Sequence, residues 1–308
     1  MLRWLPSPLK GILSLLLYIV NTLFWFIPLM LLAILKLLPI TRWQAWMSYL
    51  VDAVAVAWIS LNNFTTHIFT SIKWRVEGLE TLSRKDWYLI IANHQSWADI
   101  LILQNIFYRK IPFIKFFLKK ELLYVPFMGL CWWALDFPFM KRYSTAQLAK
   151  RPELKGKDIA TTRASCQKFK TIPTTIINFV EGTRFTDRKK TAKHSPFQHL
   201  LPPKAGGIAF TLASMGEQFN AILDFTLLYP DNPQHVAMDM LMGKLKRVVV
   251  QVEVLQVDQQ VIGDYFNDEQ FRERFQLWLN QRWQHKDQLI QQYHQAQVLA
   301  TAPDQLPC

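Results

Sequence analysis

The sequence offers little material for disulfide bonds or for a zinc site. Only three cysteines occur among its 308 residues, namely Cys131, Cys166 and Cys308, and none stands in CxxC spacing. An odd and scattered set of cysteines argues against a disulfide framework and a zinc site, and it is typical of a reducing compartment. We therefore expect no bound metal in this protein.

Patterns typical of nucleic-acid binding are also missing, although the chain is strongly basic. Its 35 Lys and Arg residues outnumber its 23 Asp and Glu residues, which gives a formal net charge of +12. Such a charge suits nucleic acid, an anionic membrane surface, or phosphate-bearing ligands such as CoA. The sequence has no helix-turn-helix, zinc or RNP-type motif, so nucleic acid is not an expected partner.

One long stretch lacks charge altogether and predicts a membrane anchor. Residues 11–35 are long enough to cross a hydrocarbon core of about 30 Å. Arg3 and Lys10 precede the stretch, and Lys36 and Arg42 follow it, so the flanking charges favour neither orientation strongly. A cleaved signal peptide is the alternative interpretation. The stretch is too long for a typical signal sequence and no small-x-small site follows it, which favours an uncleaved transmembrane helix.

A second apolar stretch, residues 43–61, contains Asp52 and several small residues. It could be a second transmembrane helix, or a helix lying in the membrane interface with Asp52 turned toward water. A core helix of the globular part is the third interpretation. We expect residues 1–70 to form a two-helix membrane anchor and residues 71–308 to form the globular domain.

The residues after the anchor predict an α/β domain. Apolar stretches predict strands at 74–76, 87–92, 174–180, 221–228 and 247–257. Helical patterns are expected near 119–130, 158–170 and 206–215, with a final amphipathic surface helix at 268–295. Strands that alternate with helices indicate a largely parallel sheet with flanking helices. The polar, basic, proline-bounded residues 187–204 predict a mobile loop over a site.

The sequence NHQSWAD at 93–99 directly follows the apolar strand predicted at 87–92. We expect His94 at the carboxyl end of this strand and Asp99 in the first turn of a helix capped by Ser96. In such a pair the carboxylate accepts from one ring nitrogen, and the other nitrogen is free to take a proton from a hydroxyl. Because this spacing also arises by chance, a purely structural histidine is the alternative.

A second motif, FVEGTR at 179–184, also directly follows a predicted apolar strand. Glu181 and Arg184 flank a turn of Gly182 and Thr183, whose backbone N–H groups suit an anionic oxygen or a phosphate, as does the guanidinium. Several cations lie between the two motifs, as an anionic headgroup pocket needs: Lys119, Lys120, Lys141 and Arg142. Lys119 or Lys141 taken singly could instead belong to a solvated basic face.

The ordered motifs NHxxxxD, KKEL and FxEGTR resemble those of the 1-acylglycerol-3-phosphate acyltransferase family, within the glycerolipid acyltransferase superfamily. The resemblance covers roughly residues 70–230, and three motifs in order make coincidence very unlikely. The sequences HLLPPKAGG at 199–207 and LDFTLLYP at 223–230 are similar to the branch that includes lysocardiolipin-type enzymes.

The resemblance implies a role for each matching residue. His94 would be the general base and Asp99 its partner. The acceptor lipid would be bound by a set of substrate-binding residues: Glu181, Gly182, Thr183, Arg184, Arg142 and one of Lys119 or Lys120. Two positions depart from the family pattern, because Val180 replaces a usual proline and Leu223-Asp224 replaces a usual apolar-proline pair. The second departure leaves the acyl-pocket assignment of that motif in doubt.

The activity implied by the resemblance is direct transfer of a fatty acyl group to the hydroxyl of a lysophospholipid. The expected donor is acyl-CoA or an acyl carrier protein, and no cofactor is needed because a thioester is already activated. The acceptor would be 1-acyl-sn-glycerol-3-phosphate, with lysophosphatidylglycerol or lysocardiolipin as alternatives. A non-catalytic lipid-binding membrane scaffold is the competing function. We expect a bacterial inner membrane with the site on the cytoplasmic side, where the donor is.

Overall fold

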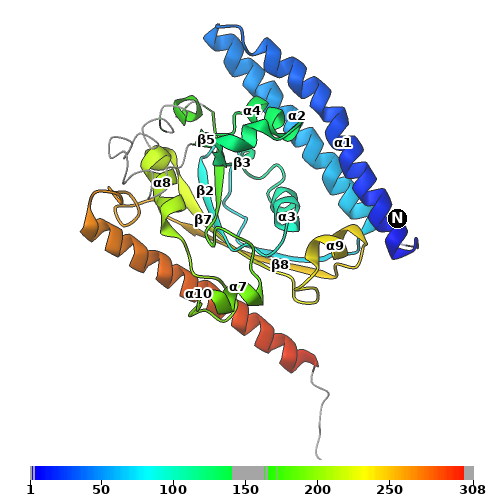
Figure 1. Ribbon diagram of the computed structural model, residues 1–308, viewed down its shortest axis with the longest axis vertical. Coiled ribbons are helices and arrows are strands. Elements are labelled where there is room, and N and C mark those ends of the chain that lie inside the picture. Colours follow the sequence, from blue (N-terminus) through cyan, green and yellow to red (C-terminus); the bar gives the residue numbers. More distant parts are fainter. Residues whose placement is uncertain (1, 3, 141–162, 164–165, 171, 302–308) are drawn as a thin grey trace, which may run out of the picture.

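The computed structural model describes residues 2, 4–140, 163, 166–170 and 172–301. Within them, helices cover both faces of a six-stranded sheet, and two long helices form a separate outer layer (Figure 1). In spatial order the strands are β1 (Lys73–Glu77), β8 (Arg247–Leu255), β7 (Ala221–Leu228), β2 (Tyr88–Ala92), β6 (Thr175–Phe179) and β3 (Ile114–Phe116). This arrangement confirms the predicted α/β fold class.

The sheet is mixed but mostly parallel. Strands β7, β2, β6 and β3 all run in one direction, while β8 pairs antiparallel with β7 and parallel with β1. β2 is buried along its whole length, because it lies in the middle of the sheet with helices on both faces. Because both faces are buried, the sequence of β2 is apolar throughout and does not alternate between polar and apolar residues.

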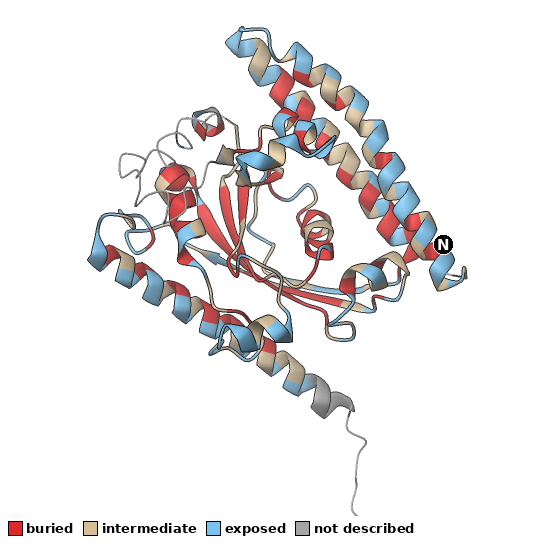
Figure 2. Cartoon of the chain, viewed as in Figure 1, coloured by how far each residue is buried: buried red, intermediate tan, exposed pale blue. Residues whose placement is uncertain are grey.

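Two hydrophobic cores lie on the two faces of the sheet. Ile90 of β2 belongs to the core under α3 (Ala98–Ile106) and α9 (Val236–Leu241). Its neighbour Ile91 belongs to the core under α8 (Ala205–Met215) and α10 (Glu269–Thr301). Buried residues accordingly line the inner faces of these helices and both faces of the central strands (Figure 2).

The outer layer is an antiparallel hairpin of α1 (Ser7–Leu35) and α2 (Thr41–Phe69), which packs beyond α3 and α9 (Figure 1). Both helices are long and apolar enough to cross a membrane. Polar contacts join them, since the Asn21 amide donates to the Asn62 side chain at 2.8 Å and Tyr18 pairs with Thr66 at 2.8 Å. Division of the chain at residue 70 into anchor and globular domain stays a prediction.

Asp52 of α2 does not turn toward water as expected for an interfacial helix. Its carboxylate lies 3.7 Å from the ammonium of Lys115, a buried residue of β3. The ion pair forms because α2 lies against the edge of the sheet, where the Lys115 charge is enclosed and needs a partner. A charged contact between α2 and the sheet thus takes the place of the solvent contact considered for an interfacial helix.

The helix predicted near 119–130 is broken into two pieces. A 3-10 turn, η1 (Lys120–Tyr124), is followed by the short helix α4 (Met128–Ala134), and β4 (Leu118–Lys119) and β5 (Phe139–Met140) flank them. Pro126 causes the break, because a proline lacks the N–H and forces the residue before it into extended backbone. Phe127 then takes a positive φ of 58°.

The other helix predictions have different outcomes. The final helix begins at Glu269 as expected, but it continues to Thr301, beyond the predicted end at 295. The loop expected at 187–204 contains a short helix, α7 (Asp187–Ala192), whose first turn is capped by Thr186. The helix predicted at 158–170 falls mostly outside the described residues. Within the described part, its last four residues form a 3-10 turn, η3 (Gln167–Lys170).

Candidate active site

His94 and Asp99 form the predicted pair. Nδ1 of His94 lies 2.8 Å from Oδ2 of Asp99, and no described residue hydrogen-bonds to Nε2 of the ring. The pair forms because His94 leaves the end of β2 and Asp99 lies in the first turn of α3, so one tight turn brings both side chains together. The Asp99 side chain is fully buried, while 14% of the His94 side chain is exposed. Nε2 can therefore meet a substrate while Nδ1 remains with its carboxylate.

Asp99 accepts hydrogen bonds at both of its oxygens. Besides the His94 ring, Oδ2 accepts from the backbone N–H groups of Gln95 at 2.7 Å and Ser96 at 2.9 Å. Oδ1 accepts from the hydroxyl of Tyr229 at 2.6 Å. So many donors offset the cost of burying a charged carboxylate and fix its orientation toward the ring.

Tyr229 is a part of the site that sequence reasoning missed. It directly follows β7, which neighbours β2, and it is buried. Burial and the nearby charge of Asp99 raise the pKa of the Tyr229 hydroxyl well above its ordinary value, so it remains a donor. The available signal was a tyrosine at the carboxyl end of a predicted apolar strand.

Ser96 lies at the start of α3, but α3 itself begins at Ala98 with Trp97 as its preceding residue. The Ser96 hydroxyl accepts from the Ala98 N–H at 3.2 Å, two residues ahead, which is a contact that a capping serine makes. Its hydroxyl is thus directed to the helix terminus, and His94 is paired with Asp99. No Ser–His nucleophile pair exists among the residues that the structure describes.

Glu181 is placed next to His94 by the strand register. Ala92 of β2 pairs with Phe179 of β6. His94 and Glu181 are each the second residue after their strand, so this pairing brings them together. The Glu181 carboxylate accepts from the His94 backbone N–H at 2.9 Å and from the Leu201 N–H at 3.1 Å, and the residue is fully buried. Burial raises the pKa of Glu181 to about 7, against the opposing effect of these two N–H groups.

The position of Glu181 differs from the acceptor contact that the resemblance implies. Both of its oxygens face backbone N–H groups inside the protein, so the side chain ties the His94 turn to the turn after β6. The residue positions the backbone of His94 in this structure. Because its carboxylate is not at the surface, substrate contact would fall to its neighbours.

Gly182, Thr183 and Arg184 form the exposed side of the same turn. Gly182 has a φ of 66°, a backbone conformation that favours glycine. The guanidinium of Arg184 lies over the ring of the exposed Trp97, 4.7 Å from its centre. This contact places the cation at the start of α3, beside the His94–Asp99 pair.

Two further cations border this turn, and sequence reasoning did not single them out. The ammonium of Lys189 donates to the Thr183 hydroxyl at 2.8 Å and to the Arg184 carbonyl at 2.9 Å. The side chain of Lys204 covers Gly182, where a Cβ would lie 3.1 Å from its Cδ. We call Arg184, Lys189 and Lys204 the basic cluster. The signal was the basic composition of residues 187–204, which had been expected to be a loop.

Lys119 and Lys120 are exposed, at the end of β4 and the start of η1. No described contact joins either of them to His94 or to the basic cluster. Both follow β3, whose carboxyl end lies at the same edge of the sheet as that of β2, since both strands run parallel to β6. Arg142, the remaining predicted binding residue, lies outside the described residues.

A row of aromatic rings leads away from His94. The His94 ring stacks on Phe179 at 4.0 Å between centres, Phe179 stacks on Phe116 at 6.4 Å, and Phe116 stacks on Phe137 at 5.9 Å. Phe179 and Phe116 are only half-buried. The imidazole thus has an apolar wall on one side, and the basic cluster lies beside the His94–Asp99 pair.

Asp224, the departure noted in the fourth motif, lies in a buried charge network. Its carboxylate contacts Lys286 at 2.6 Å and Arg282 at 2.8 Å, both on α10. Arg282 also pairs with Glu253 of β8. Burial lowers the pKa of Lys286, and the Asp224 charge opposes that change. The network ties α10 to the middle of the sheet, so an aspartate here has a structural partner.

No group of three or more His, Cys, Asp or Glu side chains in the described part of the chain could hold a metal ion. The site therefore presents a base, its buried carboxylate, an apolar wall and several cations. This set can remove a proton from a hydroxyl and bind an anionic group beside it.

Comparisons with known proteins agree with this geometry. Residues 73–219 match the family model described as Acyltransferase. The chain is 26% identical over 231 residues to human 1-acyl-sn-glycerol-3-phosphate acyltransferase delta, covering 71% of this chain and 56% of that protein. It is 23% identical over 264 residues to lysocardiolipin acyltransferase 1 of Gallus gallus, covering 82% and 65%. It thus spans little more than half the length of the first of these relatives.

A solved structure shares the fold. The 1-acyl-sn-glycerophosphate (LPA) acyltransferase PlsC from Thermotoga maritima superposes with a TM-score of 0.54 at 13% identity. The match covers 92% of this chain and 98% of that one, so it extends over the helical hairpin as well as the sheet. The family model and the sequence relatives therefore agree that residues 73–219 form an acyltransferase domain similar to that of the 1-acyl-sn-glycerol-3-phosphate acyltransferases, and the chain shares the fold of PlsC.

Proposed function

We propose that this protein transfers a fatty acyl group from a thioester to the free hydroxyl of a lysophospholipid. The observation that carries the proposal is the His94–Asp99 pair, with Nδ1 held 2.8 Å from a fully buried carboxylate. Such a pair fixes the ring so that Nε2 is the nitrogen that accepts a proton. Base catalysis of this kind is typically worth about 10²–10⁴ in rate.

The reaction takes place in one transfer without a covalent enzyme intermediate. Nε2 of His94 takes the proton of the acceptor hydroxyl while the hydroxyl oxygen attacks the thioester carbonyl. The new C–O bond forms, the C–S bond breaks, and the thiol leaves with the proton that His94 has taken. Asp99 stabilises the imidazolium that exists between these proton transfers.

The proposed acceptor carries a phosphate, because the basic cluster of Arg184, Lys189 and Lys204 lies beside the His94–Asp99 pair. We favour 1-acyl-sn-glycerol-3-phosphate, which is the substrate in the name of the human relative, 1-acyl-sn-glycerol-3-phosphate acyltransferase delta. The likeness to lysocardiolipin acyltransferase 1 supports a second candidate, a lysophosphatidylglycerol or lysocardiolipin acceptor. The aromatic row that starts at Phe179 offers an apolar wall for an acyl chain near the base.

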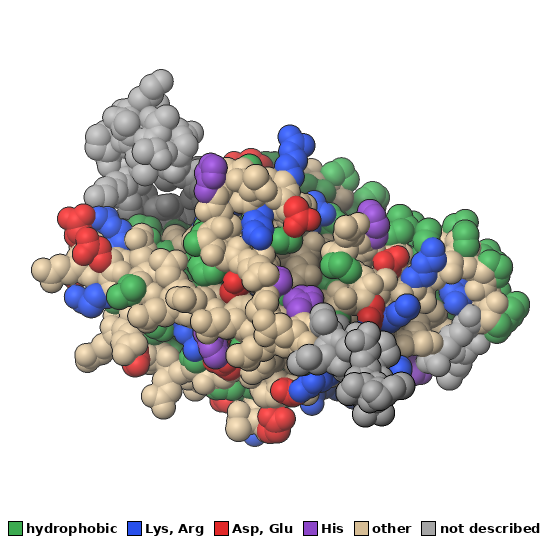
Figure 3. Space-filling model, turned by 90° about the horizontal axis from the view of Figure 1, so that it is seen from below, with side chains coloured by type: hydrophobic (Ala, Val, Ile, Leu, Met, Phe, Trp, Pro, Cys, Tyr) green, Lys and Arg blue, Asp and Glu red, His purple; other side chains and the backbone are tan. Residues whose placement is uncertain are grey.

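The α1–α2 hairpin would hold the domain at a membrane, where a lysophospholipid resides. Hydrophobic side chains gather at the end of the molecule formed by the hairpin, and lysines and arginines are spread over the rest of the face in Figure 3. The net charge of +12 would attract the protein to anionic headgroups. We propose residues 1–70 as the anchor and an inner membrane with a cytoplasmic site, which gives access to acyl-CoA or an acyl carrier protein.

The test is thiol release by detergent-solubilised protein supplied with oleoyl-CoA and a panel of lysophospholipids. Wild type should release thiol only when an acceptor is present, and the stimulating acceptor identifies the lipid. His94→Ala should abolish the acceptor-dependent release. His235→Ala is a matched control, because His235 is exposed and has no described contact with the His94–Asp99 pair, so the rate should be unchanged.

A negative result has a defined meaning. If neither acyl-CoA nor acyl carrier protein donors give release with any acceptor, the proposed activity is wrong and a lipid-binding scaffold replaces it. Equal release by wild type and His94→Ala would retain a transferase but remove His94 as its base.

A further inference from the structure

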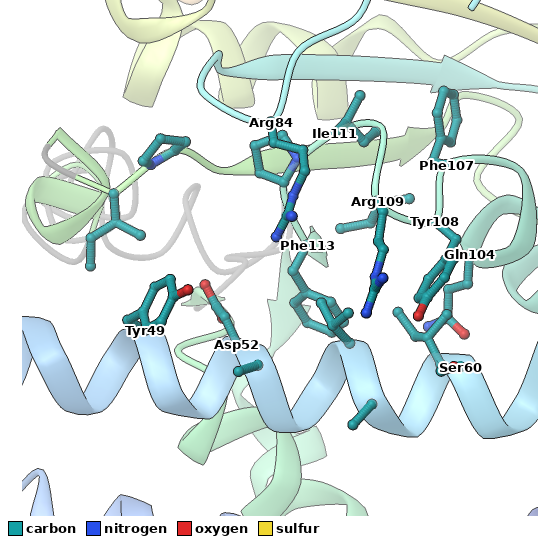
Figure 4. A pocket seen from close by; sticks show the side chains of 18 of the residues that line it. Tyr49, Asp52, Ser60, Arg84, Gln104, Phe107, Tyr108, Arg109, Ile111 and Phe113 are labelled. Carbon is teal, nitrogen blue, oxygen red and sulfur yellow. The ribbon is translucent and has the colours of Figure 1, made fainter.

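A large cavity lies between the hairpin and the sheet, away from the candidate active site. Its volume is about 780 Å³, and α2 forms one wall with Tyr49, Asp52 and Ser60 among its residues (Figure 4). The opposite wall comes from segments that precede strands, including Arg84 before β2 and Pro112 before β3. His94 lies at the other end of the strands. Five residues of strand separate the two edges by about 16 Å.

Two arginines point into this cavity without an acidic partner. Arg84 and Arg109 extend from the sheet side toward α2 in Figure 4. Neither forms an ion pair with any carboxylate in the described part of the chain, and the guanidinium of Arg109 lies 5.2 Å from the centre of the Tyr108 ring. Asp52, the acidic residue of the lining, is paired with Lys115. Both arginines are exposed to solvent, and together they give the cavity positive charge with which an anion would pair.

Buried polar atoms in the lining lack partners as well. Oε1 of Gln104 is buried with no hydrogen bond, and the Gln104 residue is only 9% exposed. The indole Nε1 of Trp25 is likewise buried and unpaired. Unsatisfied groups of this kind are costly and call for a ligand or water.

The remaining lining is apolar and continues to the outside of the hairpin. Ala53, Val56 and Ala57 of α2 line the cavity, while Tyr49 and Leu61 at its border are 68% and 42% exposed. A small soluble anion needs no such wall. An amphiphile with an anionic headgroup and acyl chains matches the arginines, the polar atoms and the apolar surface together.

We propose that this cavity binds an anionic phospholipid of the membrane as a non-catalytic ligand. Its phosphate lies between Arg84 and Arg109, and its chains run along α2. The ligand would bridge hairpin and sheet at the edge opposite to His94. This inference does not depend on the proposed transfer activity.

Native mass spectrometry of the detergent-purified full chain tests the proposal. The protein is incubated with equal amounts of phosphatidylglycerol and phosphatidylcholine that carry the same acyl chains. Wild type should retain phosphatidylglycerol preferentially. Arg84→Gln combined with Arg109→Gln should weaken that retention at least about tenfold, because two charge-assisted contacts are lost.

The adjacent exposed lysines provide a matched control. Lys85→Gln with Lys110→Gln removes the same charge next to each arginine, but neither lysine lines the cavity, so retention should be unchanged. A second variant, Ala57→Trp, fills the cavity with both arginines intact and should also lose the lipid. Equal retention of the two lipids by wild type, or undiminished retention in the arginine double variant, would overturn the proposal.

Discussion

The most informative single substitution is Tyr229→Phe. It removes one hydroxyl, which donates at 2.6 Å to Oδ1 of the buried Asp99. Hydrogen bonds to charged groups are worth about 1.5–3 kcal/mol, so we expect a stability loss of this size. Asp99 keeps its contacts with the His94 ring and with two backbone N–H groups. Turnover should therefore fall by about tenfold, which corresponds to about 1.4 kcal/mol in the barrier.

Tyr88→Phe serves as the matched control. Tyr88 is also buried, and its hydroxyl donates to a carboxylate, Asp86, at 3.1 Å, but it lies at the start of β2. Both variants should lower the thermal unfolding temperature in detergent, and only Tyr229→Phe should lower kcat in the thiol-release assay. Equal kcat values for Tyr229→Phe and wild type would refute the role of this hydroxyl in holding Asp99.

Two further predictions concern buried charges. Because folding raises the pKa of Glu181 from 4.5 to about 7, ionising it costs stability: unfolding free energy should fall by about 3 kcal/mol as pH rises from 4.5 through 7. Glu181→Gln should flatten this part of the profile of unfolding temperature against pH; an unchanged slope would assign it to other groups. Lys286→Met leaves the buried Asp224 with Arg282 as its remaining cation and should cost about 1.5–3 kcal/mol, measured by thermal unfolding, whereas adding Asp224→Leu should recover part of that loss. No recovery in the double variant would contradict the pairing.

Local sequence patterns predicted the long strands and helices of the fold, but they did not predict the short elements β3 and α9. The apolar run at 87–92 indicated a strand buried on both faces, and β2 has that position. The spacing of His94 and Asp99 indicated a contact within one turn, which needs no long-range information. The break at Pro126 could also have been predicted, because proline restricts the backbone before it.

Contacts that depend on strand order were not accessible from one sequence. Tyr229 meets Asp99 because β7 lies beside β2, although 130 residues separate them along the chain. Lys286 meets Asp224 because α10 crosses the sheet at that point. A motif likewise indicates that Glu181 matters without saying which way it points, and its burial depends on the packing of the turn around Leu201.

The most direct test of the central claim is the turnover of Asp99→Asn. The substitution keeps the shape of the side chain, but it removes the charge that orients the His94 ring and stabilises its protonated form. Acceptor-dependent thiol release should fall at least about a hundredfold. Asp231→Asn, at an exposed ion pair with Arg247, should retain the wild-type rate. A folded Asp99→Asn protein with most of the wild-type turnover would contradict base catalysis by the His94–Asp99 pair.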